Sequence, residues 1–171
     1  MNGTISQLHK GGSTNKTSDQ RQVVLLNIGY QLLNHIINKQ LKGIVEQTNV
    51  LKPGQGGGRQ GRSVIINMQK MHFVTHEAHR QRKRVYQVDI DLRNAFNAML
   101  QAALWHVMNM FHILDVDLLE QIYDSATVRL APNDAESATI TFDTGVAQGS
   151  ITSPQLFNIF INTLLWMLTA G

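Results

Sequence analysis

The sequence of 171 residues contains no cysteine. Disulfide bonds, thiolate metal ligands and cysteine nucleophiles are therefore excluded. Long apolar runs are missing too, because polar residues interrupt the longest one, at residues 156–168, and leave it too short and too polar to cross a membrane. Residues 1–22 are polar and show no signal peptide. We therefore expect an intracellular protein, either cytoplasmic or nuclear.

Hydrophobic residues make up 43% of the chain, which is enough for a packed core and too much for a wholly disordered protein. The length fits one domain, or one domain and part of another. The formal charge is +3 and the pI is near 9.4, so the chain is modestly basic.

The positive charge is clustered within fifteen residues of the chain. The eight basic side chains there are Lys70, His72, His76, His79, Arg80, Arg82, Lys83 and Arg84. Such a cluster can bind phosphates. Alternatively, the cations lie at the solvated end of a helix, close to the negative pole of its dipole. The sequence alone favours this second interpretation.

Apolar residues at helical spacing predict a helix over about 30–45, which ends at the Gly-rich stretch 52–58. Ser63 is expected to cap a second helix that runs to about Arg82. Residues 1–20 are rich in Gly, Ser, Thr and Asn, and are expected to form a loop.

Further along the chain, the pattern predicts a strand, two helices, a hairpin of two strands and a last helix. These elements are expected at residues 85–90, 94–111, 115–125, 127–130 with 138–142, and from Ser153 onward. Helices and short strands alternate irregularly, which indicates an α+β fold.

Asp91 directly follows the predicted strand and precedes the next helix. A carboxylate on such a rigid turn can hold Mg²⁺, a hard cation that prefers carboxylate and phosphate oxygens. Taken alone, Asp91 is better explained as the N-cap of the following helix. Asp89 would share the same face of the strand and is the rival carboxylate.

The residues after Asp91 resemble the first palm motif of reverse transcriptases, in which the catalytic Asp is followed by three residues, a small residue and an aromatic one. Ala95 and Phe96 occupy the small and the aromatic position, whereas Asp89 has neither at these offsets. The resemblance implies that Asp91 is a catalytic metal ligand, with the carbonyl group of Leu92 beside it. It also implies that Ala95 leaves room for the nucleotide and that Phe96 selects against ribonucleotides.

A second stretch, Gly145–Asn158, resembles the Gly-Val-x-Gln-Gly, Ser-Pro and Leu-Phe-Asn sequence of non-LTR retrotransposon (LINE-like) reverse transcriptases. Gly149 lets the backbone approach a nucleotide closely, and Gln148 can form hydrogen bonds without adding charge. The resemblance implies that these two residues line the nucleotide and the template. Ser153 and Pro154 open the supporting helix and are implied to lie on the nucleic-acid side.

Two upstream blocks match the same family in the expected order. The block that begins at Gln55 resembles Gln-x-Gly-Phe-x-x-Gly-Arg-Ser, which implies nucleic-acid contacts for Gln55 and Arg62. The block that begins at Arg21 resembles Arg-Pro-Ile-x-Leu-Leu-Asn, and a Lys-Gly turn at Lys10 precedes it. Arg21 and Lys10 are thereby implied to contact the incoming triphosphate, where two fixed cations are physically sensible.

The resemblance implies a right-hand polymerase with a fingers-like segment at 1–84 and a partial palm at 85–171, whose small antiparallel sheet is backed by helices. The implied partners are an RNA template, a DNA primer and a deoxynucleoside triphosphate, and no membrane is expected. In the implied reaction the primer 3′-hydroxyl attacks the α-phosphate with the help of two Mg²⁺ ions, for which Mn²⁺ is an alternative.

One motif of the family is missing, because no Asp-Asp pair occurs anywhere in the sequence. We therefore expect a chain that is truncated before that palm motif and inactive alone, since a two-metal site would lack most of its protein ligands. The missing palm strands would leave sheet edges unpaired, so self-association through those edges is expected.

Two other functions stay open. A non-catalytic nucleic-acid-binding relic of a retroelement would need no metal and would also explain the basic cluster. Metal-dependent hydrolysis at His72, His76 and His79 is the weaker alternative, because the His-Glu-x-x-His order of such sites is absent.

Overall fold

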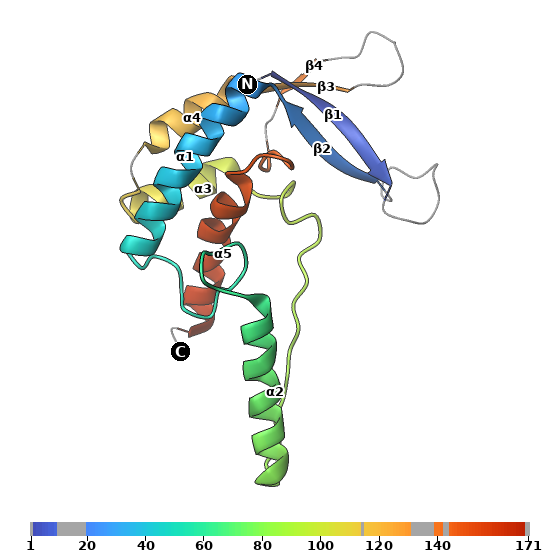
Figure 1. Ribbon diagram of the computed structural model, residues 1–171, viewed down its shortest axis with the longest axis vertical. Helices are drawn as coiled ribbons and strands as arrows, with labels where there is room; N and C mark the ends of the chain where they lie inside the picture. Colours follow the sequence, from blue (N-terminus) through green and yellow to red (C-terminus); the bar gives the residue numbers. More distant parts are fainter. Residues whose placement is uncertain (1, 10–19, 114, 131–138, 142–143, 170–171) are drawn as a thin grey trace.

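The computed structural model describes residues 2–9, 20–113, 115–130, 139–141 and 144–169. In these residues the chain forms a body of helices and a sheet, from which one helix projects (Figure 1). In chain order the elements are β1 (Asn2–His9), β2 (Gln20–Leu26), α1 (Ile28–Gln47), α2 (Val64–Arg80), α3 (Gln101–Met110), α4 (Val116–Asp124), β3 (Thr127–Leu130), β4 (Thr139–Thr141) and α5 (Ser153–Thr169). The α+β class is therefore confirmed.

The four strands form one sheet in the order β2-β1-β3-β4. β1 is antiparallel to β2, and β3 is antiparallel to β4, but β1 and β3 are parallel. The expected loop over residues 1–20 is thus wrong for 2–9. The expected antiparallel sheet is confirmed for the hairpin of β3 and β4 and is wrong for the parallel pair of β1 and β3. β1 was not predicted because its residues are mostly polar. It is stabilised by pairing with a strand on each side. β2 and β4 are the two edge strands of this sheet. Self-association through sheet edges stays a prediction.

Helices α1 and α2 begin close to the predicted residues, because a local side-chain cap starts each of them. The Asn27 side chain accepts a hydrogen bond from Tyr30 N at 2.8 Å and caps α1. The Ser63 side chain accepts one from Ile65 N at 3.1 Å and caps α2, as predicted. None of the helices in the described part of the chain is long and apolar enough to span a membrane.

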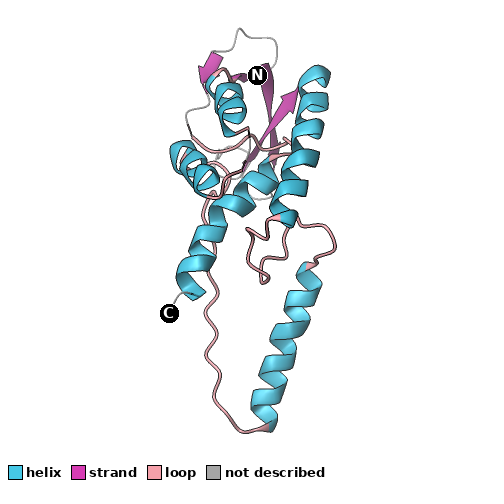
Figure 2. Cartoon of the chain, turned by 90° about the vertical axis from the view of Figure 1, so that its left-hand side faces the viewer, coloured by secondary structure: helices cyan, strands magenta, loops and turns pink. Residues whose placement is uncertain are grey.

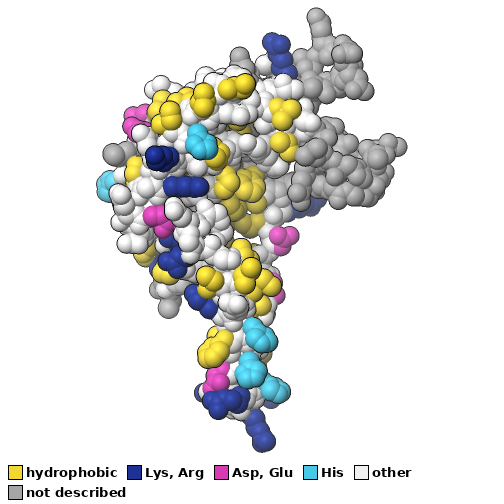
Figure 3. Space-filling model, in the orientation of Figure 1, with side chains coloured by type: hydrophobic (Ala, Val, Ile, Leu, Met, Phe, Trp, Pro, Cys, Tyr) yellow, Lys and Arg dark blue, Asp and Glu magenta, His cyan; other side chains and the backbone are white. Residues whose placement is uncertain are grey.

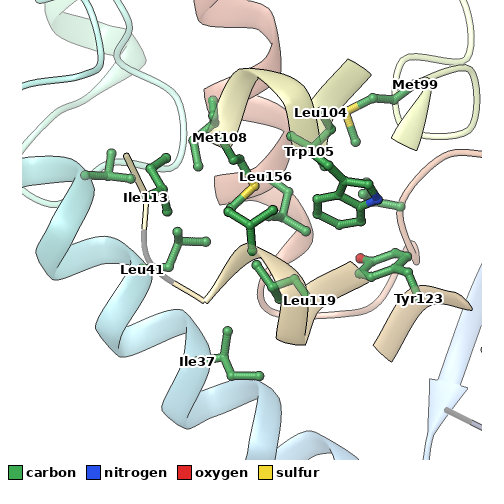
Figure 4. Packing of buried hydrophobic residues seen from close by; sticks show 14 of the residues in the cluster. Ile37, Leu41, Met99, Leu104, Trp105, Met108, Ile113, Leu119, Tyr123 and Leu156 are labelled. Carbon is green, nitrogen blue, oxygen red and sulfur yellow. The ribbon is translucent and has the colours of Figure 1, made fainter. Parts of the chain in front are cut away.

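The main hydrophobic core lies where α1, α3, α4 and α5 meet (Figure 4). Trp105 of α3 packs edge-on against Tyr123 of α4, with ring centroids 5.5 Å apart. A smaller cluster lies against the sheet and contains Ile5, Val24, Leu26, Val128 and Ala147. Both clusters draw residues from both sides of residue 84, so the two halves of the chain share their cores.

The buried face of α1 differs from the one that its apolar residues suggest. Leu32 and Ile36 are 64% and 59% exposed, whereas Asn34 and Asn38 are buried. Asn34 Nδ2 donates to Ser150 Oγ at 3.0 Å, so this buried amide has a specific partner in the loop before α5. The buried apolar residues Ile37, Leu41 and Val45 and the hydrogen-bonded amide of Asn34 thus together set how α1 is turned.

The segment between α2 and α3 corrects two predictions. Residues 85–90 form no strand, because no described strand pairs with them and β propensity alone cannot satisfy their backbone groups. They run beside α2 as an exposed loop (Figure 2). The next helix begins at Gln101 instead of Asn94, since Asn94 has a left-handed φ of 54° and residues 94–98 form a turn.

One face of α5 holds the loop 50–58 through amide side chains. Asn162 Oδ1 accepts from Lys52 N at 2.8 Å, and its Nδ2 donates to Val50 O at 2.7 Å. Gln155 and Asn158 continue this row, with hydrogen bonds to backbone carbonyl groups of the same loop. Since Asn162 is fully buried, its two bonds satisfy backbone groups that water does not reach.

We expect Asn162→Ala to lower the free energy of unfolding by about 3 kcal/mol, because two backbone groups lose their partners and a buried cavity opens. Urea denaturation followed by circular dichroism measures this change. Asn109→Ala, at an exposed position of α3, is the matched control and should change the free energy by less than about 0.5 kcal/mol. A loss for Asn162→Ala no larger than that of the control would contradict this role.

Candidate functional site

The two motif-bearing loops of the chain, 91–97 and 145–149, are joined by backbone hydrogen bonds. Val146 N donates to Phe96 O at 2.9 Å, and Gly145 N donates to Met99 O at 2.7 Å. The loops are some fifty residues apart in sequence, so this contact depends on the tertiary fold. It places Phe96 of the first motif beside the residues that precede Gln148.

Side chains reinforce the same junction. Gln148 Nε2 donates to Asn97 Oδ1 at 2.9 Å, and Gln101 Nε2 donates to Gly145 O at 3.0 Å. Gln148 is half-buried and Asn97 is exposed, so this hydrogen bond lies at the surface of the junction. The partner of Gln148 could not be read from the motif, because Asn97 belongs to the other loop.

Gly145 is required at this junction for two reasons. Its φ is +78°, in the left-handed region that side chains rarely adopt. A Cβ atom at this position would also lie 2.6 Å from Phe96 O and 2.8 Å from Asn97 Cα. Only glycine lets the two loops approach so closely.

Gly149 connects the junction to the sheet. Val24 N in β2 donates to Gln148 O at 2.6 Å, and a Cβ atom on Gly149, whose φ is +110°, would lie 2.7 Å from Val24 O. β2 is the strand that contains Arg21, whose backbone pairs with Leu8 of β1. Three blocks identified in the sequence therefore meet at one place. Lys10 lies outside the described residues.

Phe96 and Ala95 are half-buried at the edge of the junction. The ring of Phe96 packs against that of Phe157 in α5, with centroids 4.9 Å apart and planes inclined by 32°. The first turn of α5 thereby supports the aromatic position of the first motif. The sugar-selecting role of Phe96 stays a prediction.

Asp91 and Leu92 are exposed at the start of this loop. Within the described part of the chain, no three acidic or histidine side chains are grouped closely enough to hold a metal ion. Mg²⁺ is usually held by one or two carboxylates together with phosphate oxygens and water, so Asp91 and the carbonyl group of Leu92 would supply only part of its coordination. The histidine alternative has no such group either, although the rings of His72 and His76 lie 6.4 Å apart.

A family model described as reverse transcriptase (RNA-dependent DNA polymerase) matches residues 8–170. The chain belongs to this family. It is 26% identical over 163 residues to a retrovirus-related Pol polyprotein from the type-1 retrotransposable element R2 of Popillia japonica. It is 23% identical over 163 residues to a probable RNA-directed DNA polymerase from transposon BS of Drosophila melanogaster. These alignments cover 93% and 91% of this chain but 22% and 17% of the relatives, so the chain spans about a fifth of their length.

In this reverse transcriptase chain, a network of buried polar side chains supports the loop 147–153. Ser150 Oγ lies 2.8 Å from Thr152 Oγ1, and Ser153 Oγ donates to Ala147 O at 2.7 Å. Burial raises the pKa of Tyr123 to about 12, although hydrogen bonds to Ser153, Ala147 and Thr152 oppose this rise. The sequence reasoning missed the network, whose only local signal was a tyrosine among the apolar residues of α4.

The glycine-rich block holds its predicted residues in different settings. Gln55 is buried and its Nε2 donates to Asn158 O at 2.9 Å, whereas Arg62 is exposed. Ser153 is buried and its hydroxyl group is bonded to the protein, whereas Pro154 is exposed. The nucleic-acid roles of these residues stay predictions, and here Gln55 and Ser153 hold the two loops onto α5.

An ion pair between the buried Arg59 side chain and the partly exposed Glu46 anchors the same block, and it was not foreseen from the sequence. Arg59 Nε and Nη2 donate to the Glu46 carboxylate at 2.9 and 2.6 Å, and Nη1 donates to Lys52 O at 3.1 Å. The hydrogen bond from Arg59 holds the pKa of Glu46 below its usual value, against the opposing effect of burial. This bidentate pair joins the loop to the last turns of α1.

Gly145→Ala is expected to lower the free energy of unfolding by at least about 2 kcal/mol, because its Cβ would collide with the backbone at a positive φ. Amide hydrogen exchange should also show faster exchange at Val146 N–H. Gly43→Ala is the control: Gly43 lies in α1 with open space around it, so this change should stabilise the protein by about 0.5–1 kcal/mol. Equal effects of the two substitutions would contradict the junction.

The Glu46–Arg59 pair predicts a specific pH dependence. Because the folded pKa of Glu46 is depressed, its contribution is present above the unfolded value near 4.5 and is lost as the pH falls through the folded pKa. We expect Glu46→Gln to cost about 1 kcal/mol at about pH 7, because Glu46 is partly exposed, and we expect the difference from wild type to shrink below about pH 4.5. Urea denaturation at a series of pH values measures it. Glu120→Gln, at an exposed carboxylate of α4, should leave the pH profile unchanged.

Proposed function

We propose that this chain is the part of an RNA-directed DNA polymerase that presents the first catalytic carboxylate to a nucleotide-binding loop. The observation that carries the proposal is the junction of loops 91–97 and 145–149 against β2. This junction brings together three motif blocks that would contact the nucleotide if they act as in the reverse transcriptase family. Such a junction preorganises groups around one substrate, which is the main requirement of phosphoryl transfer.

The proposed architecture is that of a right-hand polymerase, with fingers in residues 1–84 and part of the palm in 85–171. β2 and the glycine-rich block would form the side of the fingers that faces the nucleotide. The shared hydrophobic cores support a fixed relation between these two parts, because α1 packs in the same cluster as α3, α4 and α5.

The proposed reaction joins a deoxynucleotide to a primer on an RNA template. The primer 3′-oxygen forms a bond to the α-phosphorus, the bond to the β-phosphate breaks, and pyrophosphate leaves with the electron pair. Mg²⁺, or Mn²⁺ in its place, would balance the charge on the phosphates when bound. Asp91 would donate a carboxylate oxygen and Leu92 its carbonyl oxygen, and the remaining ligands are not among the described residues.

The other side chains of the junction would orient the substrate. Phe96, held by Phe157, would crowd the 2′ position of the sugar, and Ala95 would leave space beside it. Gln148 and Gly149 would line the base and the template, and the cations Arg21 and Lys10 would meet the triphosphate. These roles need a fixed backbone, and the hydrogen bonds from Gly145 and Val146 support one.

A second candidate is a nucleic-acid-binding domain without catalysis. It is favoured by the lack of an Asp-Asp pair in the sequence and by the lack of any metal-binding group in the described residues. On the first proposal a nucleotide binds at Asp91 with the help of a divalent metal. On the second proposal, nucleotide binding does not depend on Asp91.

Binding of a deoxynucleoside triphosphate with Mg²⁺, measured by isothermal titration calorimetry, separates these candidates. We expect Asp91→Asn to weaken binding about tenfold with Mg²⁺ and to change nothing in EDTA, because it removes a metal-bound charge. Asp89→Asn is the matched control and should stay within twofold of wild type, a ratio well under 1 kcal/mol. Asp89 only bonds its neighbour Gln87, at 2.9 Å.

Primer extension on an RNA template completes the test. We expect no extension by this chain alone, since its sequence lacks the Asp-Asp pair. Extension that persists in Asp89→Asn and disappears in Asp91→Asn would overturn that expectation and support a complete active site. Nucleotide binding that is equal in the two variants would overturn the role of Asp91 and favour the non-catalytic domain.

A further inference from the structure

The outer end of α2 carries a dense group of exposed basic residues and takes no part in the site described above. Helix α2 has no buried residue and projects from the body, with its C-terminal end farthest away (Figure 1). Lysine, arginine and histidine side chains gather at this end (Figure 3). We call residues 79–84 the basic tip, and all six are exposed. Glu77 is the only carboxylate in residues 70–86.

Stabilisation of the helix end explains only part of this charge. Cations in the last turn of a helix interact favourably with its dipole, and His79 and Arg80 hold such positions. Arg80 is also paired with Glu77 at 2.6 Å. Arg82, Lys83 and Arg84 come after the helix has ended, are exposed, and have no ion pair in the structure as described.

The turn at the basic tip is unusual because of the residue that makes it. Lys83 N donates to Ala78 O at 2.8 Å and Arg82 N donates to His79 O at 3.0 Å, which is the Schellman pattern of a helix end. Arg82 occupies the left-handed position of this motif, with φ of 54°, where glycine is normally found. A side chain costs about 1 kcal/mol there.

An exposed aromatic ring follows the three cations. Tyr86 is 84% exposed, and it borders a shallow apolar hollow of about 260 Å³ between α2 and the segment that returns from the tip. Met71, Val74 and Val85 also line this hollow. The exposed ring and the apolar surface beside it offer a place on which one base can stack.

We propose that the basic tip and Tyr86 together bind a single-stranded nucleic acid away from the reaction centre. The guanidinium and ammonium groups of Arg82, Lys83 and Arg84 contact successive phosphates, and one base stacks on the ring of Tyr86. Cations next to an exposed aromatic ring match a strand that alternates phosphates with flat bases. The choice of nucleic acid over another polyanion rests on the proposed function, in which the chain works on an RNA template.

Fluorescence anisotropy with a labelled single-stranded RNA of mixed sequence tests the phosphate contacts. We expect the double variant R82Q/R84Q to weaken binding at least tenfold. We expect it to lower the slope of log affinity against log salt by about 1.4, since each phosphate contact contributes about 0.7 on a single strand. K39Q/K42Q removes the same charge from α1 and should stay within twofold of wild type. Equal losses in both double variants would overturn the proposal.

Substitution of Tyr86 tests the stacking contact. Tyr86→Ala should weaken RNA binding about tenfold without changing the salt slope, because stacking displaces no counterion. Tyr86→Phe keeps the ring and should retain the wild-type affinity. Both variants should keep the wild-type melting temperature, since the side chain is exposed. Full affinity in Tyr86→Ala would overturn the stacking contact.

Two further measurements distinguish this proposal from a membrane-binding surface and from the proposed function. Binding to vesicles with anionic lipids that is tighter than binding to RNA, and that is lost in R82Q/R84Q, would assign the basic tip to a membrane surface and overturn the proposal. Deoxynucleotide binding that is unchanged in Asp91→Asn, together with RNA binding that is lost in R82Q/R84Q, would refute the proposed function and support RNA binding at the basic tip. Deoxynucleotide binding that is lost in Asp91→Asn, together with RNA binding that is unchanged in R82Q/R84Q, would refute only the RNA-binding role of the basic tip.

Discussion

The contact between loops 91–97 and 145–149 is the constraint on which the rest of the site depends. The backbone hydrogen bond from Val146 to Phe96 closes it, and a second one, from Gly145 to Met99, lies just beyond it. Gly145 is the residue that allows the contact, because a Cβ atom would overlap the facing backbone. The same loop then bonds to Val24 in β2 and starts α5 four residues after Gly149. A change at this one contact therefore moves the sheet, the motif loops and the last helix relative to one another.

Buried polar side chains, more than apolar ones, set how the loops meet the helical core. Asn162 and Asn158 on α5 hold the segment 50–58, and Arg59 fastens it to Glu46 of α1. Each of these groups would be costly to bury without its partner, so alternative arrangements of the loops are disfavoured. The geometry of these loops thus rests on polar pairs, while the apolar core supplies the bulk of the stability.

Much of the secondary structure could be predicted because its signals are local. Ser63 caps α2, and apolar spacing indicates α1, α4 and α5. The failures share another cause. β1 is polar and depends on two partner strands, while residues 85–90 are β-prone and have none among the described strands. Strand formation is decided by pairing, and pairing involves residues far apart in sequence.

The sequence by itself determined the family, because motif residues such as Asp91, Phe96 and Gln148 are chemical requirements that keep their order and spacing along the chain. Only the tertiary structure decided which motif side chains face solvent and which are bonded to the protein. Asp91 is exposed, whereas Gln55 is buried against α5. The physical reason is that burial and hydrogen bonding depend on contacts between distant segments, which no local pattern specifies.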